Sequence, residues 1–279
     1  MKQLVVTADD FGLAPEVNEA VEVAHRDGIL TAASLMVAGA AATDAVMRAH
    51  RLPGLRVGLH VTLVEGQPAL PPSQIPDLVD ASGLFRTDMM RVAFEIFFRP
   101  TVRRQLRAEI EAQFAAYRTT GLALDHVNAH KHFHLHPTIA DAIISIGRSY
   151  GMRGLRVPTE PASVLAKVET PAKRRLDGPV ITPPALWLRR RARRAGLSCP
   201  DAVFGLAWSG AMTTSRLAGL INHLPEGRSE IYLHPATKDG FAGEAPGYRY
   251  AEEFAALVAP LAKAAARNAD IALGGYADF

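Results

Sequence analysis

One internal run holds five of the ten histidines of this 279-residue chain, Asp125-His126-Val127-Asn128-Ala129-His130-Lys131-His132-Phe133-His134-Leu135-His136-Pro137. On an extended chain, side chains two residues apart point the same way, whereas neighbours on a helical face are three or four apart. Pro137 suits the first turn of a helix. The spacing therefore predicts a strand that runs out into a loop crowded with imidazoles. Imidazoles bind transition metals and act as acids or bases near neutral pH.

Two adjacent carboxylates, Asp9 and Asp10, follow the first apolar run of the chain, residues 4–8. Side chains of adjacent residues in a strand point to opposite faces. One carboxylate can therefore ligate a cation while the other takes or gives a proton. Aspartate is also common in turns and helix caps, so the pair alone leaves both interpretations open.

Two further histidines lie in apolar runs, His60 within residues 56–63 and His234 at the end of residues 230–234. A single buried histidine is usually a hydrogen-bonded part of the core. Four separate strands that each present Asp or His at corresponding ends are harder to attribute to chance. In a barrel of parallel strands these ends converge on one face, where catalytic residues gather.

One Asp and two His would make a suitable ligand set for a single divalent ion. Nitrogen ligands favour Zn²⁺ or another transition metal, with Mg²⁺ as the alternative. Such an ion lowers the pKa of bound water and polarises a carbonyl oxygen. A second carboxylate can accept the water proton, and a histidine across the site can protonate a leaving group. These residue types therefore predict a metal-assisted hydrolase. A phosphoesterase is disfavoured, since it usually needs two metals and more carboxylates.

Apolar runs alternate with helical patterns along the chain. Strands are predicted at residues 3–8, 32–38, 56–63, 124–129, 154–158, 202–205, 230–234 and 270–274. Helices are predicted near 15–27, 41–51, 101–119, 137–150, 184–195, 213–223 and 250–267. The alternation indicates a parallel α/β architecture, and about eight strands indicate an irregular (β/α) TIM-like barrel. We expect residues 1–279 to form one domain with insertions near 64–100 and 159–184. Long insertions in a compact domain are usually functional lids or mobile segments.

The composition is that of a soluble protein with a formal net charge of only +3. No run of eighteen apolar residues is present, and the first residues lack a secretory signal pattern. The single cysteine, Cys199, excludes an internal disulfide and fits a reducing compartment. We therefore expect a cytoplasmic protein.

Two features remain open to two interpretations each. Basic residues concentrate at 173–194, either as a solvated helix face or as a contact for an anionic membrane surface. They are not interleaved with aromatics, so nucleic-acid binding is not expected. Phe94, Phe97 and Phe98 have helical spacing. They are either ordinary core residues or an apolar wall for a greasy substrate.

Five motifs together resemble those of the YdjC/ChbG-like carbohydrate deacetylases, a family related in architecture to the polysaccharide deacetylase barrels. They are Thr7-Ala8-Asp9-Asp10-Phe11-Gly12-Leu13 with Val17-Asn18-Glu19-Ala20, Gly28-Ile29-Leu30-Thr31-Ala32-Ala33-Ser34-Leu35-Met36-Val37, Val57-Gly58-Leu59-His60-Val61-Thr62-Leu63 with Gly66 and Pro68, His130-Lys131-His132-Phe133-His134 with Pro137, and Glu230-Ile231-Tyr232-Leu233-His234-Pro235. The resemblance covers essentially the whole chain.

The resemblance implies a role for each matching residue. The metal ligands would be Asp10, His60 and His130, with Asp9 as the general base and His234 as the general acid. The residues that line or support the site would be His132, His134 and Asn128. One departure concerns the residues before the first histidine of the cluster, where the family usually has Asp-Ser and this chain has Asn128-Ala129. The replaced carboxylate leaves the surroundings of the metal ligands to be established.

Within the family, the chain resembles the hopanoid-biosynthesis-associated HpnK subgroup. The resemblance lies in the sequence of the histidine run and in two further segments, Phe97-Phe98-Arg99-Pro100 and Arg103-Arg104-Gln105-Leu106. That resemblance implies removal of the N-acetyl group from N-acetylglucosaminyl bacteriohopanetetrol. The alternatives are a chitooligosaccharide deacetylase and a non-catalytic metal-dependent sugar-binding protein. The partners to be expected are a glycolipid or amino-sugar substrate, the inner face of the membrane as a peripheral contact, and a second copy in a homodimer.

Overall fold

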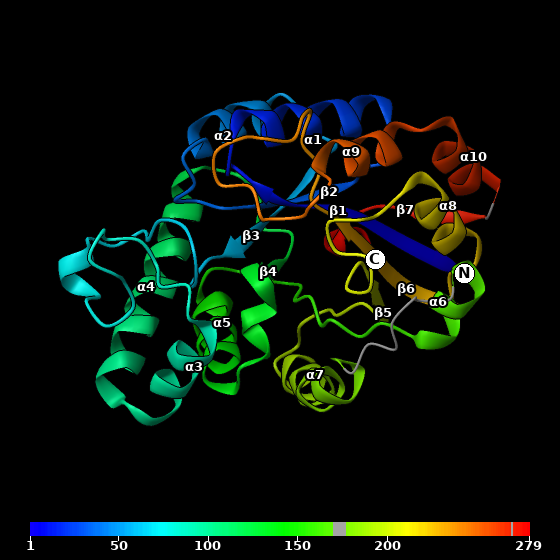
Figure 1. The fold of residues 1–279 in the computed structure, drawn as a ribbon. Coiled ribbons are helices and arrows are strands. Elements are labelled where there is room, and N and C mark those ends of the chain that lie inside the picture. The colour runs from blue at the N-terminus through cyan, green and yellow to red at the C-terminus, as the bar shows by residue number, and fades with distance from the viewer. Residues whose placement is uncertain (170–176, 269) are drawn as a thin grey trace.

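The computed structural model describes residues 1–169, 177–268 and 270–279, and a parallel sheet lies at its centre (Figure 1). The strand order is β4-β3-β2-β1-β6-β5, and β7 also pairs with β1. The strands are β1 (Lys2–Phe11), β2 (Ala32–Leu35), β3 (Arg56–Val61), β4 (Val127–Ala129), β5 (Ala202–Phe204), β6 (Gly227–Leu233) and β7 (Ile271–Leu273). Most are shorter than predicted, but their places in the chain agree with the prediction.

The central strand β1 is buried on both faces from Leu4 to Phe11. It pairs in parallel with β6 from Lys2 to Ala8 and with β2 from Thr7 onward, while β7 pairs with its first three residues. Both faces of such a parallel sheet are buried, the outer face by helices and the inner face by side chains of the barrel interior, which is why its strands are apolar almost throughout.

The barrel closes through a segment that is not a regular strand. Residues 154–158 were predicted to be one, but only the isolated bridges Val127–Leu155 and Gly154–Ser198 form there. Thr159 then accepts a backbone hydrogen bond from Val203 in β5. Pro158 breaks the ladder because proline has no N–H to donate. The predicted class, an irregular parallel α/β barrel, is confirmed.

Helices surround the sheet, with α1, α2 and α9 along the top of Figure 1 and α3, α5 and α7 along the bottom. The helices are α1 (Pro15–Asp27), α2 (Ala42–His50), α3 (Met89–Phe98), α4 (Pro100–Thr119), α5 (Pro137–Ser149), α6 (Ala162–Val168), α7 (Asp177–Arg194), α8 (Thr214–Asn222), α9 (Tyr250–Val258) and α10 (Pro260–Asn268). Short 3₁₀ turns are η1 (Pro72–Gln74), η2 (His130–Leu135) and η3 (Tyr276–Asp278). The single helix predicted at 250–267 is in fact two, since Ala259 is extended before Pro260.

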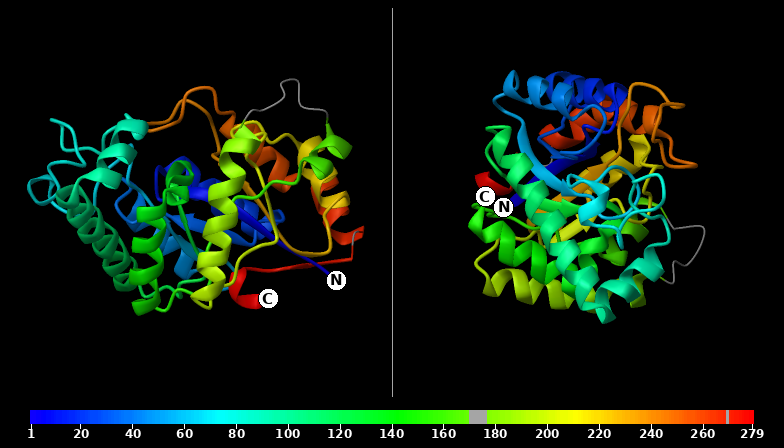
Figure 2. Two further views of the ribbon diagram at one scale, coloured as in Figure 1. Left: turned by 90° about the horizontal axis from the view of Figure 1, so that it is seen from below. Right: turned by 90° about the vertical axis from the view of Figure 1, so that its left-hand side faces the viewer.

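Two helices, α3 and α6, lie inside the predicted insertions at 64–100 and 159–184. The chain ends lie near one another in both views of Figure 2, on the side where the strands begin. No helix within the described ranges is long and apolar enough to span a membrane.

Candidate metal and catalytic site

Three predicted ligands meet at the carboxyl ends of β1, β3 and β4. The Oδ1 atom of Asp10 lies 3.2 Å from Nε2 of His60 and 3.2 Å from Nδ1 of His130. The two ring nitrogens are 3.4 Å apart. Each residue thus presents one donor atom to the same small space, and the three donors form a nearly equilateral triangle.

The donor set suits a cation. Asp10 Oδ1 is buried and has no hydrogen-bond partner among the residues that the structure describes. A buried, unpaired carboxylate oxygen is costly, and a cation bound between the three donors would remove that cost. Asp10, His60 and His130 also form the one group of three or more potential ligands found in the described part of the chain.

An irregularity of β1 directs Asp10 toward these histidines. The pairing register with β2 shifts between Ala8 and Phe11, and Asp10 has a left-handed φ of 61°. Such bulges redirect side chains next to functional sites, and a left-handed non-glycine residue stores strain that the surrounding structure must hold. The divergence predicted for Asp9 and Asp10 is observed, since the two carboxylates have different partners.

The Asp9 carboxylate is held by a buried arginine that the sequence patterns did not single out. Arg156 Nη1 donates to Asp9 Oδ2 at 2.5 Å, and Nη2 donates to Oδ1 at 2.9 Å. Burial alone would raise the pKa of Asp9, but the charge and hydrogen bonds of Arg156 hold that pKa well below its usual range. Asp9 is therefore ionised at neutral pH.

Arg156 belongs to a wider buried network. Its guanidinium also donates to Glu230, from Nε at 3.1 Å and from Nη2 at 2.8 Å, and lies over the ring of Tyr232. The hydroxyls of Thr7 and Tyr276 donate to Glu230 as well. A charged residue in the middle of an apolar stretch, 154–158, was the signal that could have identified Arg156.

Asn128 links Asp9 to the predicted ligand His60. Its Nδ2 donates to Asp9 Oδ1 at 3.0 Å, and its Oδ1 lies 2.7 Å from His60 Nδ1. A carboxylate only accepts hydrogen bonds, so the amide nitrogen must face Asp9 and the amide oxygen must face His60. His60 then carries its proton on Nδ1, which leaves the lone pair of Nε2 free for a metal ion.

The charge of His60 depends on its neighbours. Burial would lower the pKa of His60, but the carboxylates of Asp9 and Asp10 raise it above its ordinary value. A proton therefore competes with a cation for His60 Nε2. Burial would likewise raise the pKa of Asp10, but His130 and His60 hold it well below its ordinary value.

His234, the predicted acid, follows β6 near the two aspartates. Its positive form contributes to the lowered pKa values of both Asp9 and Asp10. Its Nδ1 is buried and without a hydrogen-bond partner among the described residues. Its ring contacts Tyr248, with centroids 5.1 Å apart. The Nδ1 nitrogen lies 3.9 Å from Oε2 of the buried Glu253.

The rest of the histidine run is not extended. After β4 the chain turns into η2, where Lys131 and His132 are left-handed. The predicted strand that runs out into a loop of imidazoles is confirmed, but the loop is a 3₁₀ turn, so the histidines do not line up as alternate side chains of a strand. His132 Nε2 contacts the Tyr232 hydroxyl at 2.9 Å, and His134 Nε2 donates to the Arg156 carbonyl at 3.0 Å. Both support the network around Arg156, and only His130 joins the triangle.

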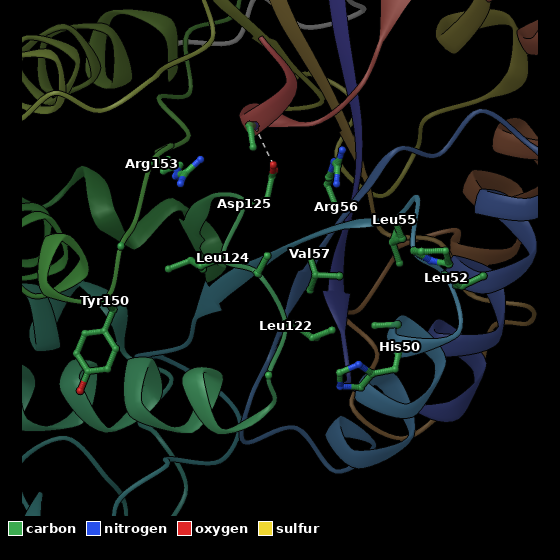
Figure 3. A pocket seen from close by; sticks show the side chains of 16 residues that line it. His50, Leu52, Leu55, Arg56, Val57, Leu122, Leu124, Asp125, Tyr150 and Arg153 are labelled. Carbon is green, nitrogen blue, oxygen red and sulfur yellow. Dashed lines mark hydrogen bonds between the residues drawn. The ribbon is translucent and has the colours of Figure 1, made fainter.

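A cavity of about 450 Å³ lies elsewhere, at the opposite ends of the strands (Figure 3). It is lined by apolar side chains such as Leu122 and Leu124, with Arg56 and Asp125 among its polar residues. Arg56 is already paired with Asp278, and Asp125 accepts from the backbone of Tyr276 and Ala277. None of the predicted site residues lines this cavity.

The predicted cationic surface at 173–194 is only partly available. Lys173, Arg174 and Arg175 lie outside the described residues. Arg189 donates to the carbonyls of Pro200 and Asp201. Arg191 and Arg193 pair with Asp141 and Asp201.

The phenylalanines at 94, 97 and 98 are not core residues, since all three are more than half exposed on α3. Phe94 and Phe98 contact each other, with ring centroids 4.5 Å apart, and Phe97 contacts His136 at 6.0 Å. His136 immediately follows η2. The exposed phenylalanines therefore lie beside the segment that carries His130.

Comparison with known proteins gives consistent matches over the whole chain. A sequence model of one family, described as YdjC-like protein, matches residues 3–268. A human protein named carbohydrate deacetylase is 31% identical, with 94% of this chain and 86% of that protein covered. A protein of the same name from Geobacillus stearothermophilus is 28% identical over 99% of this chain and 97% of its own. A solved structure from Enterococcus faecalis V583, provisionally called a cellobiose-phosphate cleavage protein, shares the fold with a TM-score of 0.76 at 24% identity, covering 99% and 98% of the two chains.

Proposed function

The chain belongs to the YdjC-like protein family, and from that premise we propose that it is a metal-dependent carbohydrate deacetylase. In this proposal residues 1–279 form one catalytic domain that removes the N-acetyl group from an acetamido sugar. Relatives over nearly the full length are named carbohydrate deacetylases. The observation that carries the proposal is the triangle of Asp10, His60 and His130 with the ionised Asp9 beside it.

Asp10, His60 and His130 would hold the ion, and their donor atoms support Zn²⁺ over Mg²⁺. The donors of Asp10, His60 and His130 are 3.2–3.4 Å apart. Two nitrogen donors favour zinc.

In the proposed reaction, Asp9 accepts one proton and His234 donates another. A bound divalent ion would polarise the acetyl carbonyl and acidify water, which matters because Asp9, with its lowered pKa, is a weak base. Asp9 accepts a proton from the water whose oxygen bonds to the acetyl carbon. His234 donates a proton to the sugar nitrogen as the bond between that nitrogen and the acetyl carbon breaks. The products are the free amino sugar and acetic acid, which loses the second water proton to solvent to become acetate.

For the substrate we propose a lipid-linked amino sugar, N-acetylglucosaminyl bacteriohopanetetrol. The support is the similarity of residues 97–106 and 125–137 to the HpnK subgroup, together with the exposed face of α3. Met90, Phe94, Phe97 and Phe98 are 81%, 64%, 51% and 59% exposed. Exposed apolar groups that cluster beside a site commonly mark a binding surface.

The same surface supports a peripheral contact with the inner face of the membrane. Arg103 and Arg104 on α4 are exposed and, within the described residues, have no carboxylate partner. Helices that lie on the surface of anionic membranes typically combine an apolar face with basic residues, as this surface does. We therefore propose this surface as the main membrane contact, in place of the arginines at 189–194, because three of those arginines already have partners.

A chitooligosaccharide is the second candidate substrate. Tyr248 is partly exposed beside His234, and its hydroxyl bonds to Ser209 at 2.8 Å. An aromatic ring at this position would suit stacking against a sugar ring. A non-catalytic sugar-binding protein would not need Asp9 and His234 at the same site.

Acetate release from an N-acetylglucosaminyl lipid and from chitobiose, each with and without a chelator, tests the proposal. A faster reaction with the lipid that the chelator abolishes is the expected result. A faster reaction with chitobiose would overturn the lipid assignment, and sugar binding without acetate release would overturn the enzyme assignment. A His234→Ala variant should lose amide hydrolysis but keep its metal. Unchanged amide hydrolysis in that variant would exclude His234 as the acid.

A further inference from the structure

We propose that Asp125, His126 and Ser34 form a positioning chain that sets the tautomer of the ligand His60 through Asn128. The inference rests on the proposed metal site but concerns residues outside it. All five side chains are buried in the barrel, with exposed fractions between 0% and 4%. None of the first three takes part in the proposed proton transfers.

The chain consists of four consecutive hydrogen bonds. Asp125 Oδ2 lies 2.9 Å from His126 Nδ1, and His126 Nε2 lies 3.0 Å from Ser34 Oγ. Asn128 Nδ2 donates to Ser34 Oγ at 2.9 Å, and Asn128 Oδ1 lies 2.7 Å from His60 Nδ1. The links connect β2, β3 and β4 across the interior of the barrel.

Donor and acceptor roles can be assigned at every link. Asn128 gives one amide hydrogen to Asp9 and the other to Ser34 Oγ. The hydroxyl hydrogen of Ser34 must then go to His126 Nε2, its other partner among the described residues. His126 Nε2 therefore accepts, and its Nδ1 carries the proton that Asp125 accepts. This assignment leaves no buried hydrogen of the chain without an acceptor.

The chain and the Asp9 carboxylate together hold the Asn128 amide in this orientation. A reversed amide would place its oxygen against the Asp9 carboxylate and its NH₂ against His60 Nδ1. His60 would then need its proton on Nε2, where it would block the metal. Hydrogen bonds to the second nitrogen of a metal-binding histidine fix its tautomer, and their loss costs about 10- to 100-fold in metal affinity.

The far end of the chain is built to hold His126 in place. His126 stacks on Tyr276, with ring centroids 4.8 Å apart and planes 18° apart. Asp125 accepts from the backbone nitrogens of Tyr276 and Ala277 at 3.0 and 2.9 Å. Gly58 leaves room for the ring, since a Cβ there would lie 2.6 Å from His126 Nε2.

The tautomer of His60 can be measured directly, without turnover. ¹⁵N NMR of the metal-free protein at alkaline pH, where the ring is neutral, should find the His60 proton on Nδ1. A proton on Nε2 in the unmodified protein would overturn the inference. That result would leave the proposed function standing if the protein still bound zinc, so the two failures are distinguishable.

A pair of variants separates positioning from packing. His126→Phe keeps an aromatic ring but removes the acceptor of the Ser34 hydroxyl. That hydroxyl can then donate only to the oxygen of a reversed Asn128 amide, so it opposes the orientation that the Asp9 carboxylate favours. We expect His60 to gain the Nε2 proton and zinc affinity to fall about 10- to 100-fold. Removing the hydroxyl as well, in Ser34→Ala/His126→Phe, should restore much of that affinity. The matched control is Ser229→Ala, which removes a buried hydroxyl without a partner among the described residues. It should change neither the His60 tautomer nor the zinc affinity. A double variant that binds zinc no better than His126→Phe would overturn the inference.

Discussion

The guanidinium of Arg156 holds the carboxylate of Asp9 with two hydrogen bonds, 2.5 and 2.9 Å long, although the residues are 147 positions apart in the sequence. The same guanidinium binds Glu230, so two buried carboxylates share one cation. Asn128 donates a second hydrogen bond to Asp9 Oδ1, and the hydroxyls of Thr7 and Tyr276 each donate a second one to an oxygen of Glu230. The proposed base is thus held mainly by Arg156, with Asn128 as a further donor.

Replacing Arg156 by Met should destabilise the protein by about 3–5 kcal/mol, because it leaves Asp9 and Glu230 buried without their cation. Urea unfolding measures the change. Arg191→Met is the matched control, since the Arg191–Asp141 pair is half exposed and such pairs contribute at most about 1 kcal/mol. Equal stability of the two variants would contradict a structural role for the Arg156 network.

Replacing Asp9 by Asn should preserve the metal but lower turnover by about 10²–10⁴-fold, the usual contribution of a positioned base. The oxygen of the new amide would still accept from Arg156 Nη2 and from Asn128, and only the bond from Arg156 Nη1 would be lost, so the fold should persist. Metal content and acetate release are measured on the same preparation. Loss of the metal together with activity would mean that Asp9 is a ligand and that its role and that of Asp10 are shared.

Replacing His60 or His130 by Ala removes one of three ligands and should abolish both metal retention and acetate release. His223→Ala is the control, since His223 is exposed at the end of α8 and bonds to Gly219 of that helix. Elemental analysis of the purified proteins gives the stoichiometry. Because the pKa of His60 is raised, zinc affinity of the unmodified protein should also increase with pH above about 6.5, the ordinary value. Full metal content in both ligand variants would refute the site.

The alternation of strands and helices and the convergence of the three proposed ligands could be predicted, since each depends on a local pattern. Asp10, His60 and His130 each follow or interrupt a short apolar run, and parallel strands bring such positions to one edge. The role of Arg156 could not be predicted because its partners come from β1 and β6. The conformation of η2 was also missed, since the left-handed Lys131 and His132 are held by contacts such as that with Tyr232.

Stability should fall as the pH drops below about 6.5. Burial lowers the pKa of His134 to about 3 and that of His132 well below its ordinary value. The unfolded chain therefore takes up protons near 6.5 that the folded chain does not, and this lowers the free energy of unfolding. His134, which is fully buried, should contribute about 2 kcal/mol of this loss at about pH 5. His60, with a raised pKa, acts in the opposite direction and costs stability as the pH rises above about 6.5.

Urea unfolding as a function of pH tests this prediction. His134→Gln keeps a donor for the Arg156 carbonyl but cannot be protonated, so its stability should fall less steeply with acid. His223→Gln, a change of an exposed ring, should have the same acid dependence as the unmodified protein. An unchanged slope in His134→Gln would show that another group causes the acid loss.

The exposed phenylalanines of α3 and the arginines of α4 should bind the protein to anionic vesicles. Each arginine near an anionic surface contributes about 1 kcal/mol, and each phenylalanine that leaves water contributes about 1.5–3 kcal/mol. Co-sedimentation should therefore increase with anionic lipid, decrease with salt because surface charges are screened, and weaken about 5-fold for each of Arg103→Gln and Arg104→Gln. Phe97→Ser/Phe98→Ser should weaken binding to a greater extent and with less dependence on salt.

Two controls match these changes: Arg191→Gln alters an arginine that is already paired, and Met47→Ser alters an apolar side chain on α2 that is 52% exposed. Both should bind like the unmodified protein, because neither lies on the α3–α4 surface. Binding that is equal for neutral and anionic vesicles, or that the controls reduce as strongly as the test variants, would exclude this surface as the membrane contact.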